Sequence, residues 1–144
     1  MTEKLKLGIA GLGRGFTVML PTLSLHPKLD VIAAVDTRPE ARGQFETDFG
    51  GAAYDTIEAM CSDADIDAIY VTTPHQLHAE HTVIAAKMGK HILVEKPMAI
   101  TLEDCTRMID ATNAAGVYLL VGHSHSYDIP ILEAHRLIAS GDYG

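Results

Sequence analysis

Short, nearly continuous apolar runs alternate with helical patterns along this chain, and no other feature restricts the fold as strongly. Six runs are expected to form strands: Leu5–Ala10, Val31–Val35, Ala52–Tyr54, Ala68–Thr72, His91–Val94 and Val117–Val121. Strands separated by helices are typical of parallel βαβ units. Because most of these runs do not alternate with polar residues, helices should cover both faces of the sheet. The sequence therefore predicts an α/β fold with a doubly wound parallel sheet in a single three-layer domain.

Capping signals mark several of the helices expected between these runs. Asp55 followed by Glu58 matches a capping box, and the same signal recurs at Thr101 and Asp104. Pro21 lies where the first crossover helix should run and removes one backbone hydrogen bond there. We therefore expect a kink or a restart of the helix near Pro21.

Length and charge exclude several classes of protein. The chain has 144 residues, enough for one domain with a core and too few for two ordinary ones. A net charge of −8 argues against nucleic-acid partners, whose binding proteins usually carry a basic surface. No apolar stretch approaches the roughly 20 residues that span a bilayer, and no signal-peptide pattern is present. We expect a cytoplasmic protein that binds neither nucleic acid nor membrane.

Cys61 and Cys105 lack CxxC spacing and are interpreted as buried thiols.

A glycine-rich turn directly follows the first expected strand. Gly11, Gly13 and Gly15 would let backbone N–H groups approach a pyrophosphate at a helix N-terminus, which is the Rossmann arrangement. Arg14 lies in the same turn, and Phe16 takes the position of the third glycine of GxGxxG. An ordinary turn is the alternative interpretation, because a lone glycine turn is weak evidence. We predict that the whole turn binds a dinucleotide.

An acidic residue closes the second expected strand. Asp36 is placed where a carboxylate accepts hydrogen bonds from the adenosine ribose hydroxyls, which favours NAD. Arg38, two residues later, would offset the repulsion of a 2′-phosphate, so NADP is also admitted. The alternative role for Asp36 is an N-cap of the helix that follows.

A second strand end should contribute to the same edge of the sheet. Thr72, Thr73 and Pro74 end the fourth strand there, and we expect them to hold the nicotinamide half of the cofactor. The alternative is that these residues only end the strand and begin a loop, since proline commonly ends a strand.

Five further histidines fall into two short groups, one directly after Pro74 and one after the last expected strand. His75, His78 and His81 fan over a helix surface instead of converging, so we predict no metal site. His123 and His125 would share one face if the last strand continued. They would then approach a substrate, or else they are exposed loop residues.

The tripeptide Glu95-Lys96-Pro97 carries the chemistry in this interpretation. It follows an apolar strand and places a lysine beyond the carboxyl edge of the sheet. Lys96 would exchange a proton with a hydroxyl or carbonyl oxygen during hydride transfer, while Glu95 holds its ammonium group. The alternative is a solvated surface lysine.

Together these motifs resemble the N-terminal half of the glucose-fructose oxidoreductase / inositol dehydrogenase / MocA family: Gly11-Leu12-Gly13-Arg14, Asp36, Thr73-Pro74, Leu77-His78 and Glu95-Lys96-Pro97. The resemblance covers essentially the whole chain. It implies strand order 3-2-1-4-5-6, binding of NAD or NADP, and reversible oxidation of a hydroxyl on sugars, cyclitols or related compounds. It also implies that Lys96 is the catalytic lysine, Glu95 its orienting partner and His78 a residue beside the nicotinamide.

Two departures refine the resemblance. Phe16 replaces a small residue, and His123-Ser124-His125 stands where the family usually has Asn-x-Arg. Both resemble the branch that oxidises aromatic cis-dihydrodiols, such as phthalate dihydrodiol dehydrogenase.

Family members also carry a second α/β domain. We therefore expect residues 1–122 to form the dinucleotide-binding domain and residues 123–144 to begin the connection to a substrate domain that this fragment lacks. The fragment alone should be inactive, and the full-length protein should bind a small-molecule substrate as a homo-oligomer. A non-catalytic dinucleotide sensor and a methyltransferase are the competing functions; the methyltransferase explains neither Thr73-Pro74 nor Glu95-Lys96-Pro97.

Overall fold

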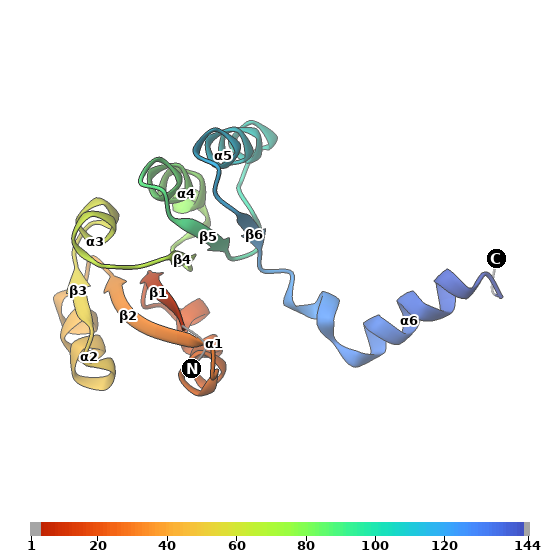
Figure 1. Cartoon of the computed structure of the whole chain (residues 1–144), viewed down its shortest axis with the longest axis horizontal. Coiled ribbons are helices and arrows are strands. Elements are labelled where there is room, and N and C mark those ends of the chain that lie inside the picture. The colour runs from red at the N-terminus through yellow and green to blue at the C-terminus, as the bar shows by residue number, and fades with distance from the viewer. Residues whose placement is uncertain (1–3, 143–144) are drawn as a thin grey trace.

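Six parallel strands form one sheet at the centre of the molecule. The structure is a computed structural model that describes residues 4–142. The strands are β1 (Leu5–Ala10), β2 (Leu29–Val35), β3 (Ala52–Tyr54), β4 (Ala68–Val71), β5 (His91–Val94) and β6 (Leu119–Val121). Their spatial order is β3-β2-β1-β4-β5-β6 and every pairing is parallel (Figure 1). The predicted fold class and strand order are confirmed.

Helices cover both faces of the sheet, as the unbroken apolar strands require. The helices are α1 (Arg14–Leu25), α2 (Pro39–Phe49), α3 (Ile57–Asp63), α4 (His78–Lys87), α5 (Leu102–Ala115) and α6 (Ile129–Ser140), with short 3-10 turns η1 (His75–Leu77) and η2 (Ser124–Tyr127). Phe16 and Phe45 from α1 and α2 enter one buried cluster. Met60, Ala85 and Met108 from α3, α4 and α5 enter a second cluster on the opposite face (Figure 1). The domain therefore has the three layers predicted.

Two details of the helices differ from the predictions. The N-cap of α3 is Thr56, whose hydroxyl accepts the N–H of Ala59, so the prediction of Asp55 as the cap was wrong by one residue. A threonine hydroxyl satisfies the same exposed backbone donor that a carboxylate would. Helix α1 also runs without a restart through Pro21, which lies on its exposed side. The cap at Thr101 is confirmed, because its hydroxyl accepts the N–H of Asp104.

The chain leaves the sheet after β6. Helix α6 lies apart from the other helices and buries none of its residues (Figure 1). The domain boundary between residues 122 and 123 stays a prediction. The outer ends of the two predicted ranges, residues 1–3 and 143–144, lie outside the described residues. Within residues 4–142, no helix has the length and apolar character needed to cross a membrane.

Two glycines differ sharply in the space around them, which yields a test of the packing. A Cβ on Gly51 would lie 2.4 Å from the carbonyl oxygen of Ile32, whereas a Cβ on Gly43, in the exposed interior of α2, would meet nothing within 4 Å. We expect Gly51→Ala to lower the free energy of unfolding by about 1–3 kcal/mol, because the backbone must move.

Gly43→Ala is the matched control and should raise the free energy of unfolding by about 0.5–1 kcal/mol, because alanine loses less backbone entropy in a helix. Urea unfolding of both variants measures the two effects. Equal effects of the same sign would contradict the packing described at Gly51.

Candidate active site

The carboxyl ends of the strands open onto two neighbouring cavities. The Asp36 cavity, of about 300 Å³, is lined by Gly11, Asp36, Glu58, Thr73 and His81 among others. The Lys96 cavity, of about 580 Å³, is lined by Arg14, His75, His78, Glu95, Lys96 and His125 among others. Thr73 lines both. The strand order reverses between β1 and β4, and ligands of open α/β sheets bind at such a point.

The glycine turn packs tightly against the end of β4. Gly11 has φ of +96°, and a Cβ there would lie 3.0 Å from both the backbone nitrogen and Cγ2 of Thr73. Thr72 fastens the two segments, because its hydroxyl donates to the carbonyl oxygens of Ala10 at 3.1 Å and Gly11 at 2.5 Å. Only glycine tolerates this combination of backbone angle and contact. Thr72 and Thr73 are therefore brought to the glycine turn as predicted.

The first turn of α1 has the features of an anion cradle. Its N-cap, Gly13, makes no side-chain cap, no acidic residue lies in the first turn, and a Cβ on Gly13 would meet nothing within 4 Å. The first N–H groups of a helix have no partner within the helix, and here no side chain of the N-cap residue caps them, which suits a pyrophosphate. Phe16 differs, because its ring is buried against Phe49 at a centroid distance of 5.9 Å. Its side chain belongs to the core and lines neither cavity.

Asp36 is held by donors on both carboxylate oxygens. Oδ2 accepts the backbone N–H of Leu12 at 2.9 Å, and Oδ1 accepts the backbone N–H of Arg38 at 2.9 Å. The Arg38 guanidinium donates to both oxygens, from Nε and Nη2, each at 2.9 Å. These hydrogen bonds, with the Arg38 side chain first, lower the Asp36 pKa to about 2 against the opposing effect of burial. The carboxylate stays charged where a ribose would bind.

The alternative role for Asp36 is not seen. The N-cap of α2 is Arg38, which makes no side-chain cap, so Asp36 lies two residues before the cap. Its hydrogen bond to the Arg38 N–H instead forms a local turn that holds the two side chains together. Asp36, which lines the Asp36 cavity, is thus paired with Arg38, which does not line it.

His78 and His81 join the loops around the two cavities. His78 is fully buried, with Nδ1 2.9 Å from the carbonyl oxygen of Pro97 and Nε2 2.9 Å from that of Thr73. His81 Nδ1 lies 3.1 Å from the Thr73 hydroxyl, and burial lowers the His81 pKa. The sequence placed Thr73, Pro97 and His78 in one site, and the structure joins all three. His81 was interpreted only as one of a histidine series.

Glu95 orients Lys96 differently from the prediction. Its Oε2 accepts the backbone N–H of Lys96 at 3.0 Å, and its Oε1 accepts the hydroxyl of Tyr70 at 2.5 Å. Among residues 4–142 there is no ion pair between Glu95 and the Lys96 ammonium group. Glu95 therefore fixes the backbone turn, and the exposed Lys96 side chain is left to face the cavity. Tyr70 was missed, although a phenol within a wholly buried strand was a usable signal.

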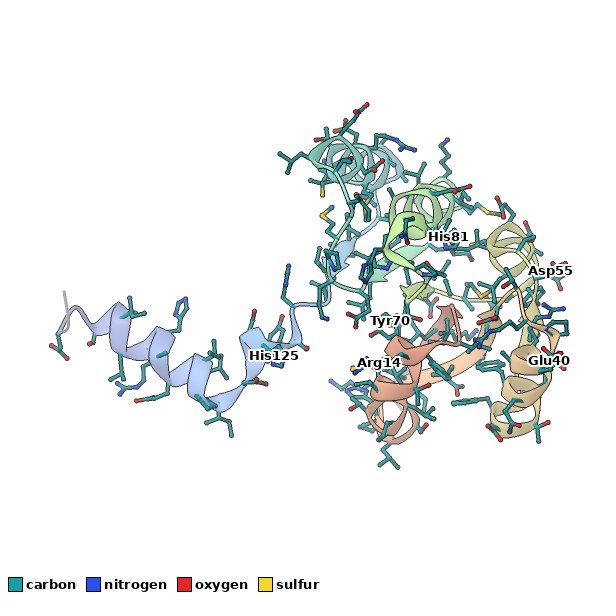
Figure 2. All side chains as sticks on the ribbon, turned by 180° about the vertical axis from the view of Figure 1, so that it is seen from behind. Arg14, Glu40, Asp55, Tyr70, His81 and His125 are labelled. Carbon is teal, nitrogen blue, oxygen red and sulfur yellow. The ribbon has the colours of Figure 1, made fainter. Side chains whose placement is uncertain are left out.

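The remaining histidines do not assemble into a metal centre. His125 lies on the segment that leads out to α6, whereas Arg14 and Tyr70 lie within the body of the domain (Figure 2). Its Nδ1 contacts Asp128 Oδ2 at 2.9 Å, and His123 is exposed and lines neither cavity. Across the described part of the chain, no group of three or more potential metal ligands gathers at one point.

Comparison with known proteins identifies the family of the fold. A family described as "Oxidoreductase family, NAD-binding Rossmann fold" matches residues 5–123. The chain belongs to this family. It is the glucose-fructose oxidoreductase / inositol dehydrogenase / MocA family that the motifs indicated, so that prediction is confirmed. The residues that line the Asp36 and Lys96 cavities all fall within or next to the stretch that this family matches.

Individual relatives agree with this assignment. The chain is 50% identical over 141 residues to the 1-carboxy-3-chloro-3,4-dihydroxycyclohexa-1,5-diene dehydrogenase of Comamonas testosteroni, covering 97% of this chain and 36% of that protein. It is 32% identical to the NADP-dependent scyllo-inositol 2-dehydrogenase IolW of Bacillus subtilis, covering 96% and 38%.

A solved structure shows the same fold. The WlbA dehydrogenase from Bordetella pertussis, in complex with NADH and UDP-GlcNAcA, matches with a TM-score of 0.95 at 28% identity, covering 100% of this chain and 42% of that one. This chain thus spans well under half the length of each of these three relatives.

The depressed pKa of Asp36 predicts a pH-dependent contribution to stability. Because the folded pKa of about 2 lies below the ordinary value of 3.8, the charged carboxylate stabilises the fold above about pH 4, and this contribution is lost as the pH falls towards 2. Asp36→Asn should therefore unfold at lower urea than the unchanged chain near neutral pH, with the difference closing below about pH 4.

Asp30→Asn is the control, because Asp30 is exposed at the amino end of the same strand. Urea midpoints for the three proteins, measured at intervals of pH, test the prediction. A difference for Asp36→Asn that stays constant down to the lowest pH would contradict it.

Proposed function

We propose that this chain is the cofactor half of a dehydrogenase that transfers a hydride between NAD and a hydroxyl-bearing carbon of a cyclic diol, cyclitol or sugar. The observation that carries the proposal is that Lys96 lines a cavity next to the Asp36 cavity. Thr73 lines both cavities. A cofactor cradle alone would serve a sensor equally well. A lysine fixed at the adjoining cavity supports a catalytic role, because a sensor needs no proton donor there.

The residues of the chain divide the work of binding the cofactor. The turn at Gly11, Gly13, Arg14 and Gly15 would present its N–H groups to the pyrophosphate, and Asp36 would accept the ribose hydroxyls. Arg38 would move from the carboxylate when a 2′-phosphate enters, so NAD is preferred and NADP admitted.

A second group of residues would hold the nicotinamide half. It consists of the end of β4 and the loop after β5, namely Thr72, Thr73, Pro74, His78, Glu95, Lys96 and Pro97.

The proton chemistry falls to Lys96. Bound NAD supplies the hydride acceptor for the alcohol, or NADH the donor for the carbonyl. As a neutral amine, Lys96 Nζ would take the hydroxyl proton during oxidation, and as the resulting ammonium it would return the proton to the oxygen during reduction. Glu95 keeps the Lys96 backbone in place, so the ammonium group enters the cavity from a fixed turn. His78 fixes the same loop from the opposite side through the carbonyl oxygen of Pro97.

The relatives and the cavity charge favour a particular substrate class within this range. The Comamonas testosteroni relative is named for a carboxylated dihydroxycyclohexadiene. Arg14 and Lys96 give the Lys96 cavity two cationic side chains against the single carboxylate of Glu95. A carboxylated cis-dihydrodiol suits that charge better than a neutral sugar. We further propose that the full-length protein is a cytoplasmic homo-oligomer whose substrate domain begins after residue 122.

Cofactor preference tests the role of Asp36. We expect Asp36→Ala to bring the dissociation constants for NAD and NADP about tenfold closer together, because a charged ribose acceptor and a repulsive charge are both removed. Calorimetric titration of this chain with millimolar NAD and NADP measures the ratio. Asp30→Ala, at the opposite end of the same strand, is the matched control. If the ratio of the NAD and NADP dissociation constants is unchanged in Asp36→Ala, the proposal that Asp36 binds the ribose is contradicted.

Activity tests the role of Lys96 in a full-length protein that carries this domain. We expect Lys96→Ala to lower kcat for dehydrogenation of carboxylated dihydrodiols by about 10²- to 10⁴-fold, with the dissociation constant for NAD almost unchanged. Lys87→Ala, on the exposed last turn of α4, is the control and should keep full activity. Full activity in Lys96→Ala would favour the sensor function or a different proton donor.

A further inference from the structure

Tyr70 places a single polar group within an otherwise apolar strand. Its side chain is 1% exposed, and all four residues of β4 are buried. The hydroxyl donates to Glu95 Oε1 at 2.5 Å, 25 residues away along the chain. Burial also raises the pKa of Tyr70, so the phenol stays protonated and remains a donor. The hydrogen bond holds Glu95 firmly, because losing it would leave the buried phenol without this partner.

Glu95 is held from several directions at once. Tyr70 donates to Oε1, while Oε2 accepts the Lys96 backbone N–H at 3.0 Å. Two further segments lie against the side chain: a Cβ on Gly15 would be in van der Waals contact with Glu95 Cγ at 3.7 Å, and one on Gly122 with Oε1 at 3.6 Å. The carboxylate is thus fixed between the start of α1, the end of β4 and the segment after β6.

Of the described residues, Glu95 is also the one carboxylate on the wall of the Lys96 cavity. The other charged side chains that line it, Arg14 and Lys96, are cationic. Because the described residues show no ion pair between Glu95 and either of them, its charge is held by neutral donors, a phenol and a peptide N–H. Neutral donors hold the group in place and leave its net negative charge to act on whatever occupies the cavity.

We propose that Tyr70 is a positioning residue that fixes Glu95 as a negative charge on the nicotinamide side of the cofactor site, and that this charge favours the oxidised cofactor over the reduced one. The inference rests on the proposed function, in which the nicotinamide half faces the Lys96 cavity. The oxidised ring carries one positive charge and the reduced ring carries none. A fixed carboxylate therefore stabilises bound NAD⁺ relative to bound NADH, while its effect on the shared pyrophosphate is common to both.

Calorimetric titration tests the proposal by measuring the dissociation constants of this chain for NAD⁺, NADH and ADP-ribose. ADP-ribose has the adenosine and pyrophosphate groups without the nicotinamide ring. Glu95→Gln keeps the shape of the side chain and removes its charge. It should raise the ratio of the NAD⁺ dissociation constant to the NADH dissociation constant about fivefold, which is the size expected for one charge acting on another through partly solvated surroundings. Tyr70→Phe removes only the hydroxyl and should raise the same ratio about two- to threefold, since Glu95 is then free to turn to water.

Tyr54→Phe provides the matched control. Tyr54 also donates its hydroxyl to a carboxylate, that of Asp63 at 3.1 Å, but it lines neither cavity. The ratio should stay unchanged in this variant. In the double variant Glu95→Gln, Tyr70→Phe, the ratio should match that of Glu95→Gln alone, because Tyr70 acts through the charge of Glu95.

Three results would overturn the proposal. If the ratio of the two dissociation constants is unchanged in Glu95→Gln, the charge of Glu95 does not favour NAD⁺, and this conclusion holds whether or not Tyr70→Phe folds. An equal loss of affinity for all three ligands in Tyr70→Phe, with the ratio unchanged, reduces Tyr70 to a packing residue. If the unchanged chain bound neither NAD⁺ nor NADH, the proposed function itself would fail, and the inference would fail with it.

Discussion

The close approach of the glycine turn to the end of β4 is the contact on which the rest of the site depends. Gly11 adopts a left-handed φ, and the Thr72 hydroxyl and backbone N–H tie the end of β4 to the carbonyl oxygens of Ala10 and Gly11. With β1 and β4 drawn together at the point where the strand order reverses, the Asp36 cavity and the Lys96 cavity lie on either side of Thr73. A larger residue at Gly11 would push these strands apart and separate the two halves of the site.

Two carboxylates give the site its electrostatic character, and they are held in different ways. Asp36 is bound by a guanidinium as well as by backbone N–H groups, so a cation offsets much of its charge. Glu95 is bound by a phenol and a peptide N–H, which hold the side chain without neutralising it. In the proposed function, Asp36 would have to exchange or share its partner when a ribose binds. Glu95 needs no exchange and remains a fixed feature of the wall.

Local signals in the sequence were sufficient for most of the fold. The apolar runs predicted all six strands to within two residues at each end, and the cap at Thr101 was predicted from its own short motif. These signals depend on periodicity and on backbone donors a few residues apart, which do not require the tertiary structure. The misplacement of one cap at Asp55 instead of Thr56 arose because adjacent residues offered equivalent oxygens. Of the kink or restart expected at Pro21, the restart does not occur, since α1 is one continuous helix from Arg14 to Leu25.

The sequence by itself determined the fold class and the family, and it singled out the glycine turn, Asp36 and the lysine after β5 as candidate site residues. Only the tertiary structure decided what each of these groups contacts. Tyr70 meets Glu95 because β4 and β5 pair in parallel, and that register is set by packing across the whole sheet. Glu95 holds the backbone of its neighbour instead of its ammonium group because the buried phenol directs the carboxylate inward. Hydrogen bonds between distant segments depend on distances that arise only when the layers pack, so no local pattern encodes them.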